Sequence, residues 1–251
     1  MNLDLITSSQ GTPWRDWQQS AHLARATWIS PAQLCPTGRR LVLVAPHPDD
    51  EILMAGGLLS HFQGREHDLL LLSVTDGEGS HPGSAQWTEH RLRHQRPLES
   101  RHALQQLKLD LAALDWRRLN LKDGAVPRDE AFLVNHLNQL LQPGDLLMCP
   151  WRADGHADHE AVGRACAQAA QARGAQLAEV PVWAWHWASP DDQRLPWPRA
   201  HRVQLSDASL ARKRLALAAH ASQLESDDGR PPVVPAQLQE CLLQPFELVF
   251  L

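Results

Sequence analysis

The sequence predicts an α/β protein whose parallel sheet is covered by helices on both faces. Apolar segments with the length of buried strands alternate with segments of helical periodicity along most of the chain. This alternation is typical of parallel sheets, because each crossover between parallel strands needs a long connection, usually a helix. A chain of 251 residues without an internal repeat or a low-complexity linker favours one domain over two small ones.

The first predicted element is a helix over residues 12–28. Thr12 stands at the position of its cap, Pro13 suits its first turn, and Trp14 and Trp17 recur at helical spacing. We expect this helix to serve a packing role.

Five strands and their helices follow in order. The first strand, 40–45, is a run of leucine and valine, and an apolar helix over 51–62 comes after it. Turn residues such as glycine, proline and aspartate separate the later elements, and they are typical boundaries of strands and helices. The later predicted strands are 67–75, 116–121, 145–150 and 179–187, and the later predicted helices are 89–109, 129–142, 158–172 and 209–223.

Composition argues against several classes of partner. The net charge is −5 with neutral histidines, and the chain has no basic block, so we do not expect nucleic-acid binding. The N-terminus lacks the pattern of a signal peptide and no apolar run has membrane-spanning length, so we expect a cytoplasmic protein without membrane insertion. The cysteines are scattered and predict neither disulfides nor a thiolate metal site; they are Cys35, Cys149, Cys166 and Cys241.

The most unusual stretch is RLVLVAPHPDDEILMAGGLLSHF, residues 40–62, where a histidine and three carboxylates separate two apolar runs. Pro48 keeps His47 extended at the end of the strand, so the helix cannot begin before the proline. The three acidic residues then occupy the first helical turn, where the helix dipole favours negative charge. An acidic helix start explains these carboxylates, but it explains neither His47 nor the second histidine cluster, HADH at 156–159.

These polar residues follow predicted strands, and we expect them to meet at one edge of the sheet. In open α/β sheets, ligands bind beyond the carboxyl ends of the strands. Histidine and carboxylate suit zinc, and a catalytic zinc site takes three protein ligands and leaves one position open. His47, Asp50 and one histidine of the HADH cluster would supply such a set. The remaining carboxylate and histidine are then available as a base and as a partner for an oxyanion.

Six short motifs together carry a resemblance to a known family. They are APHPDDEILMAGG, TDGEGS, RPLESRHAL, DG at 123–124, GHADHEAVG and HASQ at 220–223. In this order they resemble the LmbE-like family of zinc de-N-acetylases, which includes the N-acetylglucosaminyl-phosphatidylinositol (PIG-L) deacetylases. The resemblance covers roughly residues 38–251, which leaves 1–37 as an N-terminal helical extension of a single domain. It implies a Rossmann-like fold with a mostly parallel sheet, a divalent metal, usually zinc, and hydrolysis of an acetamide on a sugar.

The resemblance also assigns roles to individual residues. His47, Asp50 and His159 correspond to the metal ligands, and Asp49 corresponds to the general base that activates water. His156 corresponds to the histidine that, when protonated, stabilises the oxyanion or donates a proton to the leaving amine. Asp158 is expected to orient His156, and a carboxylate in that place would raise the proton affinity of the imidazole.

Other positions have two interpretations each. Arg96 either reaches a sugar hydroxyl or phosphate, or forms an ion pair with Glu99 on the surface of its helix. Asp123 either accepts a hydrogen bond from a sugar hydroxyl or simply forms an Asp-Gly turn. His220 is expected to be a structural hydrogen-bonding residue. Four tryptophans are candidates for stacking on a sugar ring or for packing; they are Trp151, Trp183, Trp185 and Trp187.

Three classes of function follow from these features. A metal-dependent amidase acting on a small N-acetylated amino sugar or glycoconjugate explains the most residues. A Rossmann-type nucleotide binder fits the strand order alone, but the first turn lacks GxGxxG and carries carboxylates that would repel phosphates. A non-catalytic metal-binding or glycan-binding module would have no need of a base and an acid, yet Asp49 and His156 are both present.

Overall fold

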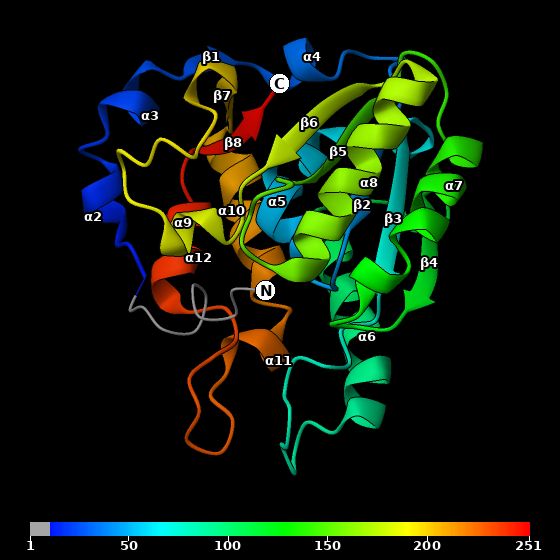
Figure 1. The fold of residues 1–251 in the computed structure, drawn as a ribbon, viewed down its shortest axis with the longest axis vertical. Helices are drawn as coiled ribbons and strands as arrows, with labels where there is room; N and C mark the ends of the chain where they lie inside the picture. Colours follow the sequence, from blue (N-terminus) through cyan, green and yellow to red (C-terminus); the bar gives the residue numbers. More distant parts are fainter. Residues whose placement is uncertain (1–10) are drawn as a thin grey trace.

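The computed structural model describes residues 11–251, and these residues build one eight-stranded sheet with helices on both faces (Figure 1). The predicted fold class, an α/β protein with a mostly parallel Rossmann-like sheet, is confirmed. The strands are β1 (Thr27–Ile29), β2 (Leu41–Ala45), β3 (Leu69–Thr75), β4 (Asp115–Leu121), β5 (Leu146–Pro150), β6 (Gln176–Val180), β7 (Ala200–Gln204) and β8 (Phe246–Phe250).

The strand order is β1-β7-β8-β6-β5-β2-β3-β4. The pairs from β6 to β4 are all parallel, as is the pair of β1 with β7. The last strand, β8, is antiparallel to both of its neighbours. The strands β5, β2, β3 and β4, which precede the candidate site residues, are therefore adjacent and point the same way.

The strand β2 shows how the two faces of the sheet are covered. Its side chains alternate between two hydrophobic clusters, so that Leu41 and Leu43 pack on one face while Val42 and Val44 pack on the other. Figure 1 shows α7 and α8 on one side of the sheet and α5 and α10 behind it. The larger helices are α5 (Asp50–Leu59), α6 (Glu89–Gln106), α7 (Glu130–Leu140), α8 (Ala157–Arg173) and α10 (Asp207–Leu217).

Most predicted elements lie where the sequence placed them, within a few residues at each end. The helix predicted over 89–109 forms as α6 in spite of Pro97 in its interior. In the part of the chain that the structure describes, no helix combines the length and the apolar character needed to cross a bilayer.

The prediction of one helix over 12–28 is wrong. Two short helices form instead, α2 (Trp14–Trp17) and α3 (Ala21–Arg25), and the chain then enters the edge strand β1. Ser20 causes the break, because its hydroxyl caps the second helix by accepting the N–H of Leu23 at 3.1 Å.

The predicted strand over 179–187 is correct only at its start. Strand β6 ends at Val180, and α9 (Ala184–Trp187) follows it. The carboxylate of Asp154 forces this turn, since it accepts the backbone N–H groups of three residues at 2.8–3.0 Å: Val182, Trp183 and Ala184.

The C-terminal part of the chain differs most from the prediction. The helix expected over 209–223 divides into α10 and α11 (Ala221–Leu224), with His220 at the start of the second. The strands β7 and β8, the short helix α4 (Pro31–Leu34) and α12 (Ala236–Leu242) were not predicted. At the carboxyl edge of the sheet, loops 76–88 and 225–235 extend together, joined by the bond from Arg230 Nη1 to the carbonyl of Pro82 at 2.6 Å (Figure 1).

Candidate active site

The predicted site residues gather at the carboxyl edge of the sheet, as the strand order requires. Residues 47–50 follow the central strand β2, and residues 156–159 begin α8 after the adjacent strand β5. Asp123 follows β4 on the other side. Residues that are far apart in the sequence therefore meet around His47, whose Nε2 lies 3.2 Å from Asp158 Oδ2 and 3.3 Å from Asp123 Oδ1.

The turn after β2 holds its residues in a strained conformation. Asp49 has φ +133°, which is rare for a residue with a side chain. Both sides of this residue are fixed: the N–H of Asp49 donates to Glu51 Oε2 at 3.1 Å, and Arg96 donates to the carbonyl of Pro48 at 2.7 Å. Thr75 Oγ1 also donates to the carbonyl of Pro46 at 2.8 Å. The conformation of this residue therefore depends on contacts from three elements.

His47, Asp50 and His159 fit a divalent metal. Ligand atoms of the three residues all lie within 4.8 Å of one another. Asp50 Oδ2 is 3.1 Å from His47 Nδ1 and 3.2 Å from His159 Nε2. His159 Nε2 is buried and makes no hydrogen bond to the described residues, although an acceptor is so near. A buried ring nitrogen left open beside a carboxylate is the arrangement expected of a ligand.

The other ring nitrogen of each histidine faces a carboxylate. His159 Nδ1 lies 2.9 Å from Asp154 Oδ2, and His47 Nε2 lies beside Asp158 and Asp123. Histidines that bind metals commonly place their second nitrogen on a carboxylate, which fixes the ring and strengthens its basicity. Asp154 was not predicted as a site residue. Its only signal in the sequence is its position five residues before His159.

The charges of this cluster shift the pKa values of its members. Burial alone would lower the pKa of His159, but Asp50 and Asp154 raise it to about 9. Burial likewise opposes protonation of His47, yet Asp123, Asp158 and Asp50 raise its pKa well above the usual value. Burial would raise the pKa of Asp50, and the two histidines instead hold it well below the normal range.

Asp49 has the opposite shift from Asp50. Burial raises the pKa of Asp49 to about 8, and the negative charges of Asp50 and Glu51 act in the same direction against the nearby guanidinium of Arg96. Two adjacent carboxylates therefore differ widely in proton affinity. This separation is typical of a site that uses one carboxylate as an anion and the other as a base.

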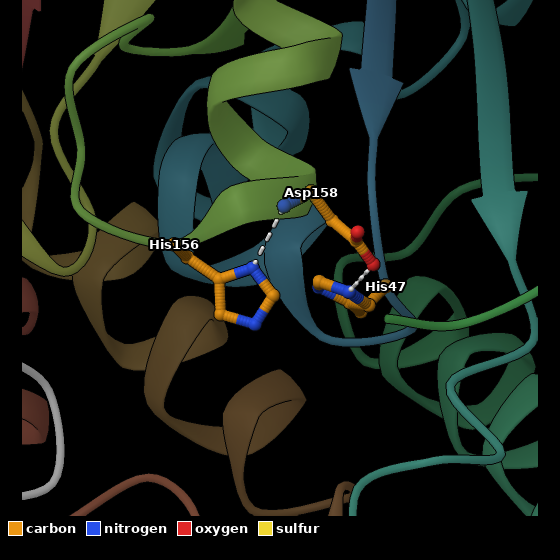
Figure 2. A group of neighbouring side chains, drawn as sticks. All are labelled: His47, His156 and Asp158. Carbon is orange, nitrogen blue, oxygen red and sulfur yellow. Dashed lines mark hydrogen bonds and ion pairs between the residues drawn. The ribbon is translucent and has the colours of Figure 1, made fainter. Parts of the chain in front are cut away.

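The predicted pairing of Asp158 with His156 is wrong. Figure 2 shows that the Asp158 carboxylate contacts His47, while His156 Nδ1 accepts the backbone N–H of Asp158 at 3.2 Å. The expected rise in the proton affinity of His156 is also not found. Burial, followed by the charges of His159 and His47, lowers the pKa of His156 to about 3, and Asp158 offsets this only in part.

Arg96 is buried, with 2% of its surface exposed, so the interpretation as a helix-surface ion pair is wrong. Its Nη1 donates to the carbonyl of Gly77 at 2.8 Å, and its Nη2 lies 3.4 Å from Asp49 Oδ1. Glu99 is buried too and accepts the hydroxyl of Ser222 at 2.6 Å. The guanidinium of Arg96 therefore faces the protein, and it contacts the turn that carries Asp49.

Asp123 forms the expected Asp-Gly turn, and its hydrogen bond to a sugar hydroxyl stays a prediction. It begins an Asp-Gly turn in which Gly124 has φ +76°, and it also contacts His47. Its Oδ2 accepts the N–H of Gly79 at 2.8 Å. His220 is fully buried, and among residues 11–251 neither of its ring nitrogens has a hydrogen-bond partner; its Nε2 lies 3.9 Å from Glu51 Oε1. The expected structural hydrogen bond of His220 is thus not found.

Of the four candidate tryptophans, Trp183 lies beside a site residue. Its ring is roughly parallel to that of His156, with the centroids 6.4 Å apart. Trp185 and Trp151 are buried, and Trp185 packs edge-on against Trp17 at 4.8 Å. These two serve packing.

A comparison with protein-family models matches this chain to one family. The family model for GlcNAc-PI de-N-acetylase, PIG-L, matches residues 42–170 of the chain. This segment contains every residue of the candidate metal site and the three candidate catalytic residues, Asp49, His156 and Asp158. None of the curated proteins matches the chain.

Several solved structures share the fold. A conserved protein from Thermus thermophilus is 24% identical, with a TM-score of 0.52 over 74% of this chain and 80% of that one. An N,N'-diacetylchitobiose deacetylase from Pyrococcus horikoshii is 16% identical, with a TM-score of 0.56 over 78% of this chain and 73% of that one. The zinc-inhibited form of a teicoplanin deacetylase is 13% identical, with a TM-score of 0.58 over 84% of this chain and 97% of that one.

Proposed function

The chain belongs to the PIG-L family of GlcNAc-PI de-N-acetylases, and from this membership we propose that it is a zinc-dependent hydrolase acting on an N-acetylated amino sugar. The observation that carries the proposal is the pair of histidines around Asp50, each with its second nitrogen on a carboxylate, beside a carboxyl group of raised pKa. The substrate is a small sugar or glycoconjugate.

The metal would be held by His47, Asp50 and His159. When bound, zinc supplies a Lewis acid for the acetamide carbonyl and makes water a stronger acid. Asp158, Asp123 and Asp154 hold the two rings in place from behind, so that the ligand atoms keep their positions.

Asp49 is the proposed base. The reaction adds water to the acetamide carbon, breaks the carbon–nitrogen bond, and releases acetate and the free amine. The carboxylate of Asp49 takes the proton of the attacking water, and that proton is then available for the departing nitrogen. A base of pKa about 8 accepts a proton far more readily than an ordinary aspartate, and so it suits reaction near neutral pH.

His156 is the proposed oxyanion partner in its neutral form. Its Nδ1 accepts the N–H of Asp158 and therefore carries no proton, which places the ring proton on Nε2. An uncharged Nε2–H can donate a hydrogen bond to the oxygen that becomes negative in the transition state. The lowered pKa of His156 supports this role over the protonated acid expected from the sequence.

Release of acetate from N-acetylated sugars tests the proposal. Zinc-loaded protein would be incubated with N-acetylglucosamine, its phosphates and N,N'-diacetylchitobiose, and acetate and free amine would be measured together. We expect equal amounts of both products from at least one compound. A protein that holds zinc but releases neither product would be the non-catalytic binding module instead, and one that binds nucleotide but no zinc would be the Rossmann-type binder.

A further inference from the structure

A groove of about 680 Å³ is lined by residues of α6, of the edge strand β4 and of the turn after β3. Four cationic side chains line it: Arg93 and Arg101 from the helix, and Arg118 and Lys122 from the strand and its end. Among residues 11–251, two carboxylates share the lining, Asp76 and Glu78. The groove is therefore cationic in a protein whose net charge is −5.

The two carboxylates are buried beneath the cations. Asp76 Oδ1 accepts Arg118 Nη2 at 2.7 Å, and Glu78 Oε1 lies 3.1 Å from Arg93 Nη2 and 3.6 Å from Lys122 Nζ. The side chains of Arg93, Lys122 and Arg118 remain 53%, 51% and 39% exposed, whereas the carboxylates are almost inaccessible. An incoming ligand would thus meet cations that are held in position from below, together with one exposed carboxylate, Glu89, whose Oε2 lies 3.0 Å from Lys122 Nζ.

The fourth cation and the floor complete the groove. Arg101 lies 5.9 Å over the ring of Trp116, and within residues 11–251 it forms no ion pair with a carboxylate. The ring of Trp116 is fixed in turn, because its Nε1 donates to Ser73 Oγ at 2.9 Å. The positive charge of Arg101 is therefore not neutralised by a carboxylate, and it lies over an indole ring that is held by a hydrogen bond.

The groove is continuous with the candidate active site. Glu78 and Lys122, which line its near end, are followed directly in the chain by Gly79 and Asp123. The N–H of Gly79 donates to Asp123 Oδ2 at 2.8 Å, and Asp123 Oδ1 is 3.3 Å from His47 Nε2. A ligand whose reacting group lies at the metal site can therefore extend toward these cations.

We propose that this groove binds an oxyanion, such as a phosphate or a carboxylate, attached to the acetylated sugar. The proposal rests on the proposed deacetylase function for the identity of the reacting group, and it adds the charge of the substrate. Exposed arginine and lysine donors favour phosphate and carboxylate through charge-assisted hydrogen bonds. The metal-site residues do not supply this selectivity, since the groove lies to one side of them.

Binding measurements on zinc-loaded protein test the proposal. The probes are N-acetylglucosamine 1-phosphate, N-acetylglucosamine joined to glucuronate, and neutral N-acetylglucosamine, and their dissociation constants would be measured by calorimetry at low salt. We expect at least one charged probe to bind roughly tenfold more tightly than the neutral sugar, as one charge-assisted hydrogen bond allows. The first two probes distinguish a phosphate from a carboxylate, and added salt should weaken only the charged ones.

The double variant Arg101→Gln/Lys122→Gln tests whether the preference for charged probes comes from the cations of the groove. Both side chains are exposed, so the fold should survive, and the preference for the charged probe should fall about tenfold or more. Arg117→Gln is the matched control, because Arg117 lies on the same strand beside Arg118 but does not line the groove. Equal affinity of charged and neutral probes for the wild type, or the same change of preference in the control, would overturn the proposal. Charge-dependent binding without acetate release would instead contradict only the deacetylase function.

Discussion

At the scale of single residues, the candidate metal site is organised before any ion binds. Asp50 lies between His47 and His159, and buried carboxylates hold the far nitrogen of each ring. The same carboxylates stabilise the imidazolium forms, which is why the pKa of both rings is raised. The carboxylates that hold the two histidine rings therefore also make protons compete with the metal for the ring nitrogens.

The first prediction follows from this competition. Since His159 has a pKa of about 9 in the metal-free protein, it is protonated at pH 7 and must lose its proton to bind zinc. Zinc binding at pH 7 should release at least one proton, and apparent affinity should rise with pH until about pH 9. Calorimetric titrations in buffers of different ionisation enthalpy measure the number of protons. Zinc affinity that does not change between pH 6 and pH 9 would contradict the shift.

The second prediction separates the base from the ligands. Asp49→Asn should keep its zinc, because Asp49 is not among the close group of ligand atoms, and should lose roughly two to four orders of magnitude in kcat because an amide accepts no proton. Asp50→Asn is the comparison and should lose zinc. Metal analysis of both purified variants decides the matter, and similar zinc loss in the two would mean that the roles are wrongly divided.

The sequence predicted these residues better than it predicted their contacts. His47 and Asp50 became candidates because they lie in a short motif at the end of a strand, and the family resemblance selected His159 from the HADH cluster. The contact between His47 and Asp158 joins positions 111 residues apart, and local spacing wrongly assigned Asp158 to its near neighbour His156. Asp154 was missed for the same reason, since its partners in residues 182–184 lie in another element.

At the scale of elements, α6 acts on the site through Arg96. This helix packs beside the turns that follow β2 and β3, and the guanidinium of Arg96 joins the carbonyls of Pro48 and Gly77. Gly77 has φ +68°, and a Cβ on it would overlap with Arg96 Nη1, far inside van der Waals contact. The glycine therefore leaves the space in which Arg96 reaches Asp49.

The third prediction tests this arrangement with two glycines of equal backbone conformation. Gly77→Ala should displace Arg96 and lower kcat about tenfold or more, as the turn that carries Asp49 loses its support. Gly174→Ala at the end of α8 is the control, because its φ is +67° and nothing lies within 4 Å of an added Cβ. Both changes carry a left-handed backbone penalty of about 1–2 kcal/mol. Thermal unfolding should show a larger loss for Gly77→Ala, because displacing the buried Arg96 adds to the shared backbone penalty, and an equal loss of kcat in the two variants would exclude a role specific to Arg96.

Elements were mispredicted where a distant side chain overrides local preference. Trp183, Trp185 and Trp187 alternate as they would on a strand, yet the Asp154 carboxylate binds the backbone there and α9 forms. The strands β7 and β8 were missed because each becomes a strand through pairing with chain segments that are remote in sequence. Three of the strands beside the site, β2, β3 and β5, were predicted because their apolar runs can be recognised without such a partner.

At the scale of the whole molecule, the N-terminal segment joins the same sheet as the site. The strand β1 pairs in parallel with β7, and Trp17 is buried with its Nε1 donating to the carbonyl of Trp185 at 3.1 Å. The sequence suggested an N-terminal helical extension over residues 1–37, of which residues 1–10 lie outside the described part. These contacts agree with the expectation of a single domain. We therefore predict that the N-terminal segment and the core unfold together.

The last prediction measures this coupling with two tryptophans of the same segment. Trp17 is buried against Trp185, so Trp17→Ala should cost about 3–5 kcal/mol through lost burial and a remaining cavity. Trp28 on β1 is 48% exposed, and Trp28→Ala should cost clearly less. Denaturant unfolding followed by far-ultraviolet circular dichroism reports mainly on the core helices, which neither residue belongs to. If the segment is part of the cooperative unit, the midpoint of that core transition falls for Trp17→Ala because its free energy is shared by the whole domain. A core midpoint that stays in place while tryptophan fluorescence changes earlier would mean that residues 11–37 unfold as a separate unit.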